Sequence, residues 1–212
     1  MTDGQFTKLQ AGITVTSSGS GSISADTAKI RELLDDPNPS IRLSELPPAL
    51  FVSSLRNQIE YSVQPGKTEI LDKSPDEPYG AGFPQIYARI INWMSEQSVE
   101  WQTHGWNFAL TYSTGDTPGG SVIIGLLSER ARRFSNELRG AALTLNYQFE
   151  GAKVTTKLEP RLGNLEEAMV FASANYHVDE APPTTEDEAR AISTGYWKDF
   201  IEACKHLLVE KD

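Results

Sequence analysis

The chain has 212 residues, of which 29 are acidic and 19 are basic, so its formal net charge at pH 7 is −10. This length fits one large domain that can bury a core without metals or disulfides. The negative charge repels phosphate backbones and anionic lipids, and it therefore disfavours nucleic acid and membrane surfaces as partners.

The cysteine content and the N-terminus bear on location. The single cysteine, Cys204, can form neither an intramolecular disulfide nor a thiolate metal cluster alone. The N-terminus has no basic start followed by an apolar run, and no apolar stretch in the chain is long enough to cross a bilayer. These features predict a soluble protein that stays in the cytoplasm.

Residues 1–23 are expected to be a flexible N-terminal segment with a possible strand. The stretch FTKLQAGITVT has the composition of a strand, and the glycine- and serine-rich tract SSGSGSIS follows it. A short helix is predicted next, with its N-cap at Ser24 or Asp26 and its end before Pro37. Two prolines in LSELPPALF then favour an extended approach to the main body.

The next segments predict a hairpin, a loop and a helix. Ile59, Tyr61 and Val63 alternate before the turn QPGK, and TEILD returns as the second strand. The segment KSPDEPYGAG reads as a loop, and we expect its Tyr79 to be exposed. Residues 83–97 repeat apolar side chains at spacings of three and four, which predicts a helix packed on a sheet.

Residues 104–112, HGWNFALTY, alternate as a strand does. Four large apolar side chains on one face of a strand indicate core rather than a ligand pocket. His104 begins the stripe and is its one member suited to chemistry. The stripe consists of His104, Trp106, Phe108, Leu110 and Tyr112.

Residues 121–140 predict a helix, although the first five could instead form a strand. This helix carries the main concentration of basic residues in the chain, which could bind phosphate or an acidic protein surface. A solvated helix face, with Glu129 and Glu137 offsetting the charge, is the alternative. Because the whole chain is acidic, a protein is favoured over nucleic acid as the partner. The basic residues are Arg130, Arg132, Arg133 and Arg139.

The last third of the chain predicts a hairpin, a strand and a long helix. Residues 141–149 and 152–158 alternate on either side of the turn EG. Residues 165–178 are apolar on both faces in their middle, which is typical of an interior strand. The helix begins at a capping box formed by Thr185 and Glu188.

Polar residues at the end of the 165–178 strand form a candidate site. His177 and Asp179 point the same way in an extended chain, so the carboxylate could orient the imidazole. Together with His104 they define one alternative function, a small-molecule site or a hydrolase-like enzyme with His177 as acid or base. The competing interpretation is a polar strand end before a proline turn.

The element order predicts an α+β fold, with a largely antiparallel sheet of hairpins packed against about four helices. Residues 24–212 are expected to form one domain, and an open alternative is that it contains two related halves meeting near 114–120. Motifs for a catalytic nucleophile, a zinc site or a phosphate-binding loop are absent, so neither a cofactor nor a metal is predicted.

The leading functional hypothesis is therefore a non-enzymatic protein that binds another protein or assembles into a homo-oligomer. The surfaces expected to do so are the arginine-bearing helix, the loop with Tyr79, and the N-terminal segment as a docking arm. Small-molecule binding or catalysis near His104 and His177 is the alternative. Nucleic-acid binding through the arginines is disfavoured.

Overall fold

The computed structural model describes residues 6–18, 26–127, 141–160 and 166–209. The strands in these ranges are β1 Phe6–Ser18, β2 Ser40–Glu45, β3 Pro48–Ser54, β4 Ile59–Gln64, β5 Lys67–Asp72, β6 Glu100–Ser113, β7 Leu143–Phe149, β8 Ala152–Pro160 and β9 Met169–Val178. The helices are α1 Thr27–Leu34, α2 Phe83–Glu96, α3 Gly119–Gly125 and α5 Glu186–Leu208.

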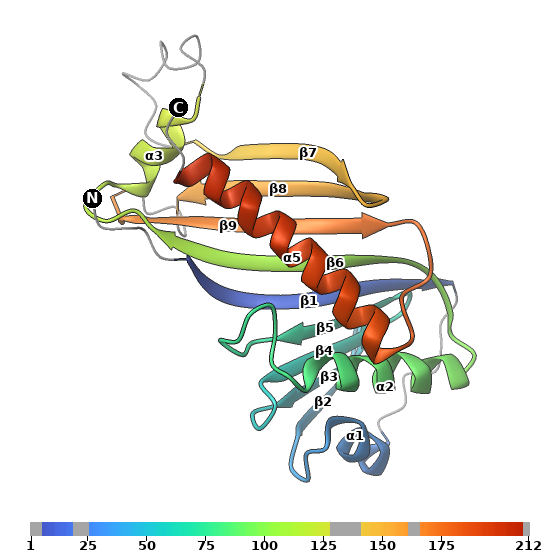
Figure 1. The fold of residues 1–212 in the computed structure, drawn as a ribbon. Coiled ribbons are helices and arrows are strands. Elements are labelled where there is room, and N and C mark those ends of the chain that lie inside the picture. The colour runs from blue at the N-terminus through green and yellow to red at the C-terminus, as the bar shows by residue number, and fades with distance from the viewer. Residues whose placement is uncertain (1–5, 19–25, 128–140, 161–165, 210–212) are drawn as a thin grey trace.

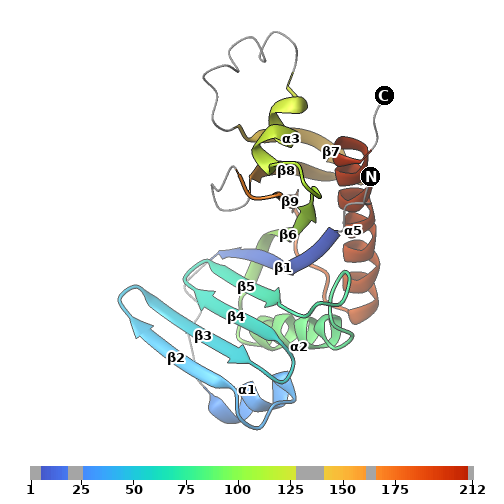
Figure 2. The same ribbon diagram turned by 90° about the vertical axis from the view of Figure 1, so that its left-hand side faces the viewer.

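The described strands form one antiparallel sheet of nine strands, in the order β2-β3-β4-β5-β1-β6-β9-β8-β7 (Figure 1). Helices α1, α2 and α5 lie on one face of this sheet, as Figure 2 shows from the side. We call this face the inner face and the opposite face the outer face. The architecture confirms the predicted α+β class with an antiparallel sheet.

Strand β1 lies in the middle of the sheet, between β5 and β6. Its inner-face side chains Ala11, Ile13 and Val15 are fully buried. A strand is therefore present where the sequence suggested one. The wider expectation of a flexible N-terminal segment, or docking arm, is wrong for residues 6–18, because their apolar side is needed in the core.

The hairpins follow the predicted pattern, with one addition. Strands β4 and β5 form the hairpin predicted around QPGK, and β7 and β8 form the one predicted around EG. The prediction missed β2 and β3, which pair as a further hairpin where only an extended approach was expected. The proline pair, Pro47 and Pro48, lies at the turn of this hairpin, where the missing amide hydrogens cost little.

The stripe in β6 is core, as predicted. The side chains of Trp106, Phe108 and Leu110 are at most 2% exposed and point to the inner face. The Phe108 ring packs against Trp197 and Phe200 of α5, at centroid distances of 5.5 and 6.3 Å. Helix α5 begins at the predicted capping box, in which Thr185 Oγ1 accepts a hydrogen bond from the Glu188 amide.

A similar run of elements follows each of the two central strands. Strand β1 is followed by α1, the strands β2 to β5, and α2; β6 is followed by α3, the strands β7 to β9, and α5. In both runs the last strand returns to pair antiparallel with the first, so that β5 pairs with β1 and β9 with β6. The boundary between the two runs of elements therefore lies between α2 and β6.

A buried ion pair fastens the loop between β5 and α2 to the core. The Lys8 ammonium donates to Asp72 Oδ2 at 2.5 Å and to the Asp76 carbonyl at 2.7 Å. Asp72 Oδ2 also accepts from the Ser74 hydroxyl at 2.8 Å and the Gly80 amide at 3.1 Å. Both ionic side chains are fully buried, and burial lowers the pKa of Lys8.

Replacing Asp72 by Asn should lower the free energy of unfolding by about 3–5 kcal/mol, because the buried Lys8 charge loses its counterion. Urea denaturation monitored by circular dichroism measures this change. Asp35→Asn is the control, since Asp35 is exposed and lies 4.0 Å from Arg56; it should change the value by less than about 0.5 kcal/mol. Equal effects of the two substitutions would contradict the role given to the buried pair.

Candidate functional site

The outer face carries a row of side chains that crosses the sheet from one half to the other. Glu69 of β5 pairs with Thr14 of β1, and Thr14 pairs with Gly105 of β6. Gly105 pairs in turn with His177 of β9, and His177 with Lys153 of β8. Adjacent strands are about 4.8 Å apart, so Glu69 and His177 lie roughly 14 Å apart on the same face.

Hydrogen bonds between side chains fix the middle of this face. The Asn175 amide donates to Asn107 Oδ1 at 2.8 Å, and the Asn107 amide donates to Thr14 Oγ1 at 3.1 Å. Gly105 leaves room for this chain, because a Cβ there would stand 2.9 Å from Asn175 Nδ2. A polar surface whose side chains are already ordered loses less conformational entropy when a partner binds.

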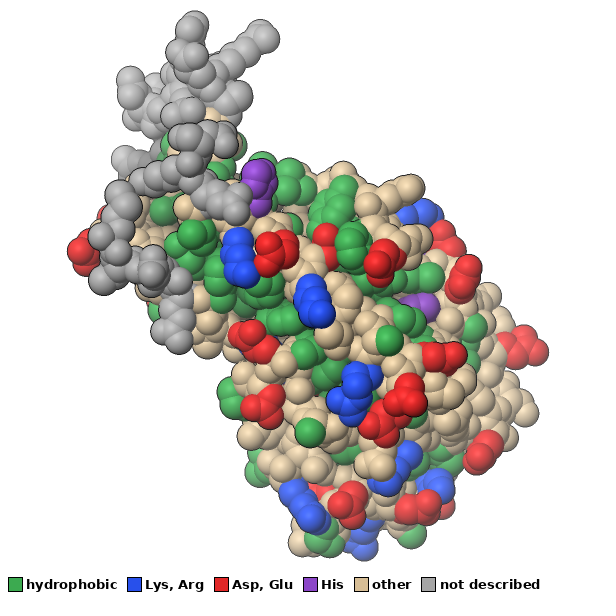
Figure 3. Space-filling model, in the orientation of Figure 1, with side chains coloured by type: hydrophobic (Ala, Val, Ile, Leu, Met, Phe, Trp, Pro, Cys, Tyr) green, Lys and Arg blue, Asp and Glu red, His purple; other side chains and the backbone are tan. Residues whose placement is uncertain are grey.

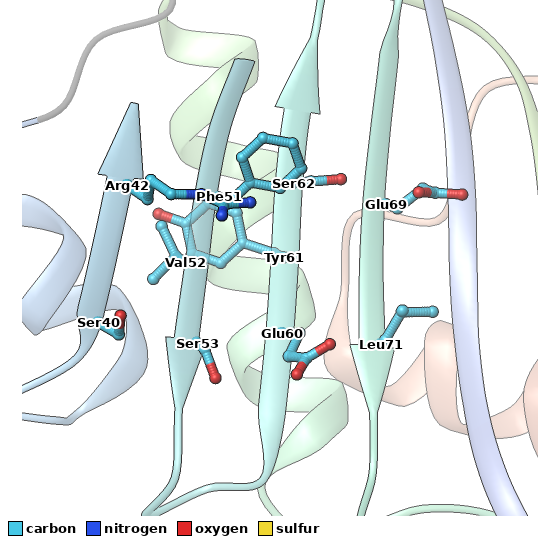
Figure 4. Close-up of a pocket in the computed structure, with 10 residues that line it drawn as sticks. All are labelled: Ser40, Arg42, Phe51, Val52, Ser53, Glu60, Tyr61, Ser62, Glu69 and Leu71. Atoms are coloured by element: carbon cyan, nitrogen blue, oxygen red, sulfur yellow. The ribbon is translucent and has the colours of Figure 1, made fainter. Parts of the chain in front are cut away.

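A shallow groove of about 440 Å³ lies over β2 to β5 (Figure 4). We call it the outer-face groove. Its floor and walls come from four neighbouring strands, so the hairpins alone determine its shape. The lining residues are Ser40, Arg42, Phe51, Val52, Ser53, Glu60, Tyr61, Ser62, Glu69 and Leu71.

The outer-face groove combines apolar and acidic groups. The Arg42 guanidinium lies 4.9 Å from the centroid of the Phe51 ring, a cation–π contact that Figure 4 shows on the outer side of the strands. Leu71 is half-buried on β5, at the other side of the groove. Glu60 forms an ion pair with Lys73 at 3.3 Å, and Glu69 forms one with Lys67 at 2.9 Å.

Sequence reasoning missed this groove, although a signal was present. Phe51 stands between Leu50 and Val52, and Leu71 follows Ile70, so both strands are apolar on both faces at these points. A strand with only one covered face has no structural need for such residues on its other face. Apolar residues that break the alternation, such as Phe51 and Leu71, were therefore the sequence signal for the outer-face groove.

The strand end at His177 brings together the residues expected there. His177 Nε2 lies 2.9 Å from Asp179 Oδ1, so the two side chains do point the same way. Lys153 of β8, which sequence reasoning did not include, donates to Asp179 Oδ2 at 2.5 Å. The hydrogen bonds from Lys153 and His177 hold the pKa of Asp179 below its ordinary value. The cluster is exposed to solvent, with Asp179 58% exposed.

His104 does not belong to that cluster. It lies on the inner face, 4% exposed, with Nδ1 2.9 Å from the Glu180 carbonyl oxygen. Its neighbour Gly105, and not His104 itself, pairs with His177, so the two imidazoles lie on opposite faces of the sheet. The structure therefore does not bring His104 and His177 into one site. Burial lowers the pKa of His104.

Tyr79 is buried, which corrects the expectation of an exposed side chain. It is 7% exposed and stacks on Phe83 at a centroid distance of 4.8 Å. Its loop folds onto the core because the Lys8 and Asp72 pair holds it there. Burial raises the pKa of Tyr79, and its hydroxyl has no hydrogen-bond partner within the part of the chain that the structure describes. Tyr79 is therefore not a surface for a partner.

Two further sequence candidates can be placed only in part. The arginines proposed for partner binding, Arg130, Arg132, Arg133 and Arg139, lie outside the described residues. Cys204 is fully buried on α5, and burial raises the pKa of its thiol to about 12. A thiol in that state is a poor nucleophile at neutral pH.

Among the described residues, no group of three or more His, Cys, Asp and Glu side chains is placed to hold a metal ion. Within the same ranges, no helix has the length and apolar content needed to cross a membrane. Comparison of the chain with models of known protein families and with curated protein sequences finds no match.

Burial of His104 predicts a pH dependence of stability. The unfolded chain binds a proton on this residue near its ordinary pKa of 6.5, whereas the folded protein does so only at lower pH. The free energy of unfolding should therefore fall as pH drops through 6.5. His104→Asn keeps a donor for the Glu180 carbonyl and removes the titration, so it should flatten this fall.

Chemical denaturation at about pH 7.5 and about pH 5.5 measures the effect. The exposed His206 on α5 supplies the control variant, His206→Asn. A pH profile that His104→Asn leaves as steep as that of the unmodified protein would show that its burial does not govern the dependence.

Proposed function

We propose that the protein acts without catalysis, by binding a protein partner in the outer-face groove. The observation that carries this proposal is the position of Phe51 and Leu71, two apolar side chains on the face that α1, α2 and α5 do not cover. Half-exposed aromatic side chains held by an arginine are typical of protein interfaces. A shallow, open groove of this kind fits a segment of polypeptide better than an enclosed small molecule.

Charge indicates the chemistry of the partner. Glu60 and Glu69 border the apolar part of the groove, and a basic side chain of a partner would compete there with Lys73 and Lys67 for the two carboxylates. The chain carries a net charge of −10. Such a field attracts basic partners over long range and orients them on approach. The proposed partner is therefore a protein that presents a basic side chain between these carboxylates and apolar side chains against Phe51 and Leu71 on either side of it.

The side of the molecule that carries the helices offers a contrast. Figure 3 shows acidic and basic side chains interspersed over that side. Its ion pairs include Lys29 with Glu32 and Lys205 with Glu202, which join neighbouring turns of one helix. Such pairs are common on solvated surfaces and contribute little to recognition. Glu60 and Glu69 form pairs of the same kind, so the groove is distinguished by the half-buried Phe51 and Leu71 and not by its ion pairs.

Reversing both groove charges, with Glu60→Lys and Glu69→Lys, should abolish the binding of a basic partner. Quantitative mass spectrometry first identifies the proteins recovered with the tagged unmodified protein, the groove variant and the control. The affinity of each purified candidate for these three forms is then measured. The matched control is Glu32→Lys with Glu202→Lys, which makes the same change in net charge and also breaks two lysine ion pairs.

A supporting result has three parts. The purified candidate binds the unmodified protein and the control, loses at least about tenfold in affinity for the groove variant, and binds more weakly as salt increases. A candidate that the control variant loses equally would show that only net charge matters. Retention of the same affinity by the groove variant would rule out the groove as the binding surface.

A second candidate function is favoured by the 2.9 Å hydrogen bond between His177 and Asp179. A carboxylate that orients an imidazole is a common arrangement for acid and base chemistry or for holding a polar ligand. Both residues are exposed, so a ligand would reach them directly from solvent.

The second candidate predicts a small molecule that raises the thermal unfolding temperature of the unmodified protein and leaves that of His177→Ala unchanged. A thermal-shift screen of metabolites tests this, with His206→Ala as the control variant. A screen in which every stabilising compound also stabilises His177→Ala would exclude the cluster as its site.

A further inference from the structure

The free edge of strand β7 lacks the features that normally protect the edge of a sheet. It is the last strand in the order of the sheet, so among the described residues it pairs with β8 alone (Figure 1). Its sequence, LTLNYQF, contains no charged residue and no proline over its seven residues. Exposed edges of this composition pair readily with another strand.

The other edge of the sheet is protected in the usual way. Strand β2 carries Arg42 and Glu45, and the turn that follows it, Leu46 and Pro47, contains a proline. Charges and prolines discourage a further strand from adding to an edge. The two edges therefore differ, and β7 is the edge open to pairing.

The turn that joins β7 to β8 determines which backbone groups face outward. Glu150 and Gly151 have φ angles of 46° and 84°, so they form a two-residue turn between the paired residues Phe149 and Ala152. In such a hairpin the pair beside the turn is hydrogen-bonded, and hydrogen-bonded pairs then alternate along the ladder. The amide and carbonyl groups of Thr144, Asn146 and Gln148 therefore point away from β8.

The sequence of β7 is complementary to itself about Asn146. If two copies pair antiparallel with Asn146 opposite Asn146, Leu145 lies opposite Tyr147 and Leu143 opposite Phe149. Thr144 then lies opposite Gln148, so apolar residues meet apolar ones on the inner face and polar residues meet polar ones on the outer face. The outward groups of the two strands would form about six backbone hydrogen bonds.

The apolar side chains of β7 are partly exposed in the single chain, and one of them is already held in place. Leu143, Leu145 and Tyr147 are half-buried in the single chain, so each retains surface that a second copy could cover. The Tyr147 hydroxyl donates to Asp199 Oδ2 of α5 at 2.7 Å, which fixes the ring on the inner side of the strand. An ordered ring loses little entropy when it enters an interface.

We propose that two copies of this chain pair antiparallel through β7, which extends the nine-stranded sheet across a two-fold axis at Asn146. This interface lies at the opposite end of the sheet from the outer-face groove and does not depend on the function proposed for that groove. Two-fold symmetric pairing of one strand with its own copy is a closed arrangement, so the assembly stops at the dimer.

Sedimentation velocity of the full chain, from low-micromolar to high-micromolar concentration, tests the proposal. The unmodified protein should shift from monomer towards dimer as concentration rises. Asn146→Lys places two like charges opposite each other at the axis and should weaken dimerisation about fivefold or more. Thr7→Lys is the matched control: Thr7 is exposed on β1, pairs with Thr111 of β6, and lies far from the β7 edge in the strand order. It should dimerise as the unmodified protein does.

Mixing two variants separates pairing from any loss of structure. Asn146→Lys and Asn146→Glu should each dimerise weakly alone, whereas an equimolar mixture should form a heterodimer, because position 146 then faces an opposite charge. Failure of the mixture to dimerise would overturn the proposed register. A protein that stays monomeric at every concentration, or a dimer that Asn146→Lys leaves unchanged, would overturn the proposed interface.

Discussion

The pairing of β1 with β6 is the constraint on which the rest of the structure depends. These two strands are the longest in the described sheet, with 13 and 14 residues, and they pair along nearly their whole length. Each anchors one half of the sheet, since β5 pairs with β1 and β9 pairs with β6. Ile13 and Trp106 meet across this pair and are fully buried, so the core of both halves is continuous at this point.

Features encoded over short distances in the chain could be predicted from the sequence. The hairpins β4–β5 and β7–β8 were evident because alternation and turn residues act within a few positions. The capping box at Thr185 was evident for the same reason. The central position of β1 was not, because its partners lie far along the chain. The β2–β3 hairpin was hidden because two adjacent prolines favour an extended segment as much as a turn.

The candidate sites show the same difference between contacts of residues close in the chain and contacts of residues far apart in it. His177 and Asp179 are two residues apart, so an extended strand places them together. Lys153 joins them only because β8 pairs with β9 in one particular register, which the sequence does not determine. Tyr79 was expected at the surface because its loop is polar. Its burial follows from the contact of Lys8 with Asp72, two residues 64 positions apart.

The place of α5 in the chain order bears on biosynthesis. This helix follows every strand in sequence, yet it covers aromatic residues that β6 and β9 contribute, such as Phe108 and Tyr176. While the ribosome is still making residues 186–208, those rings lack their contacts with α5, so the second half of the sheet exposes apolar surface. The stage before α5 is complete is therefore the one in which the chain is most open to aggregation.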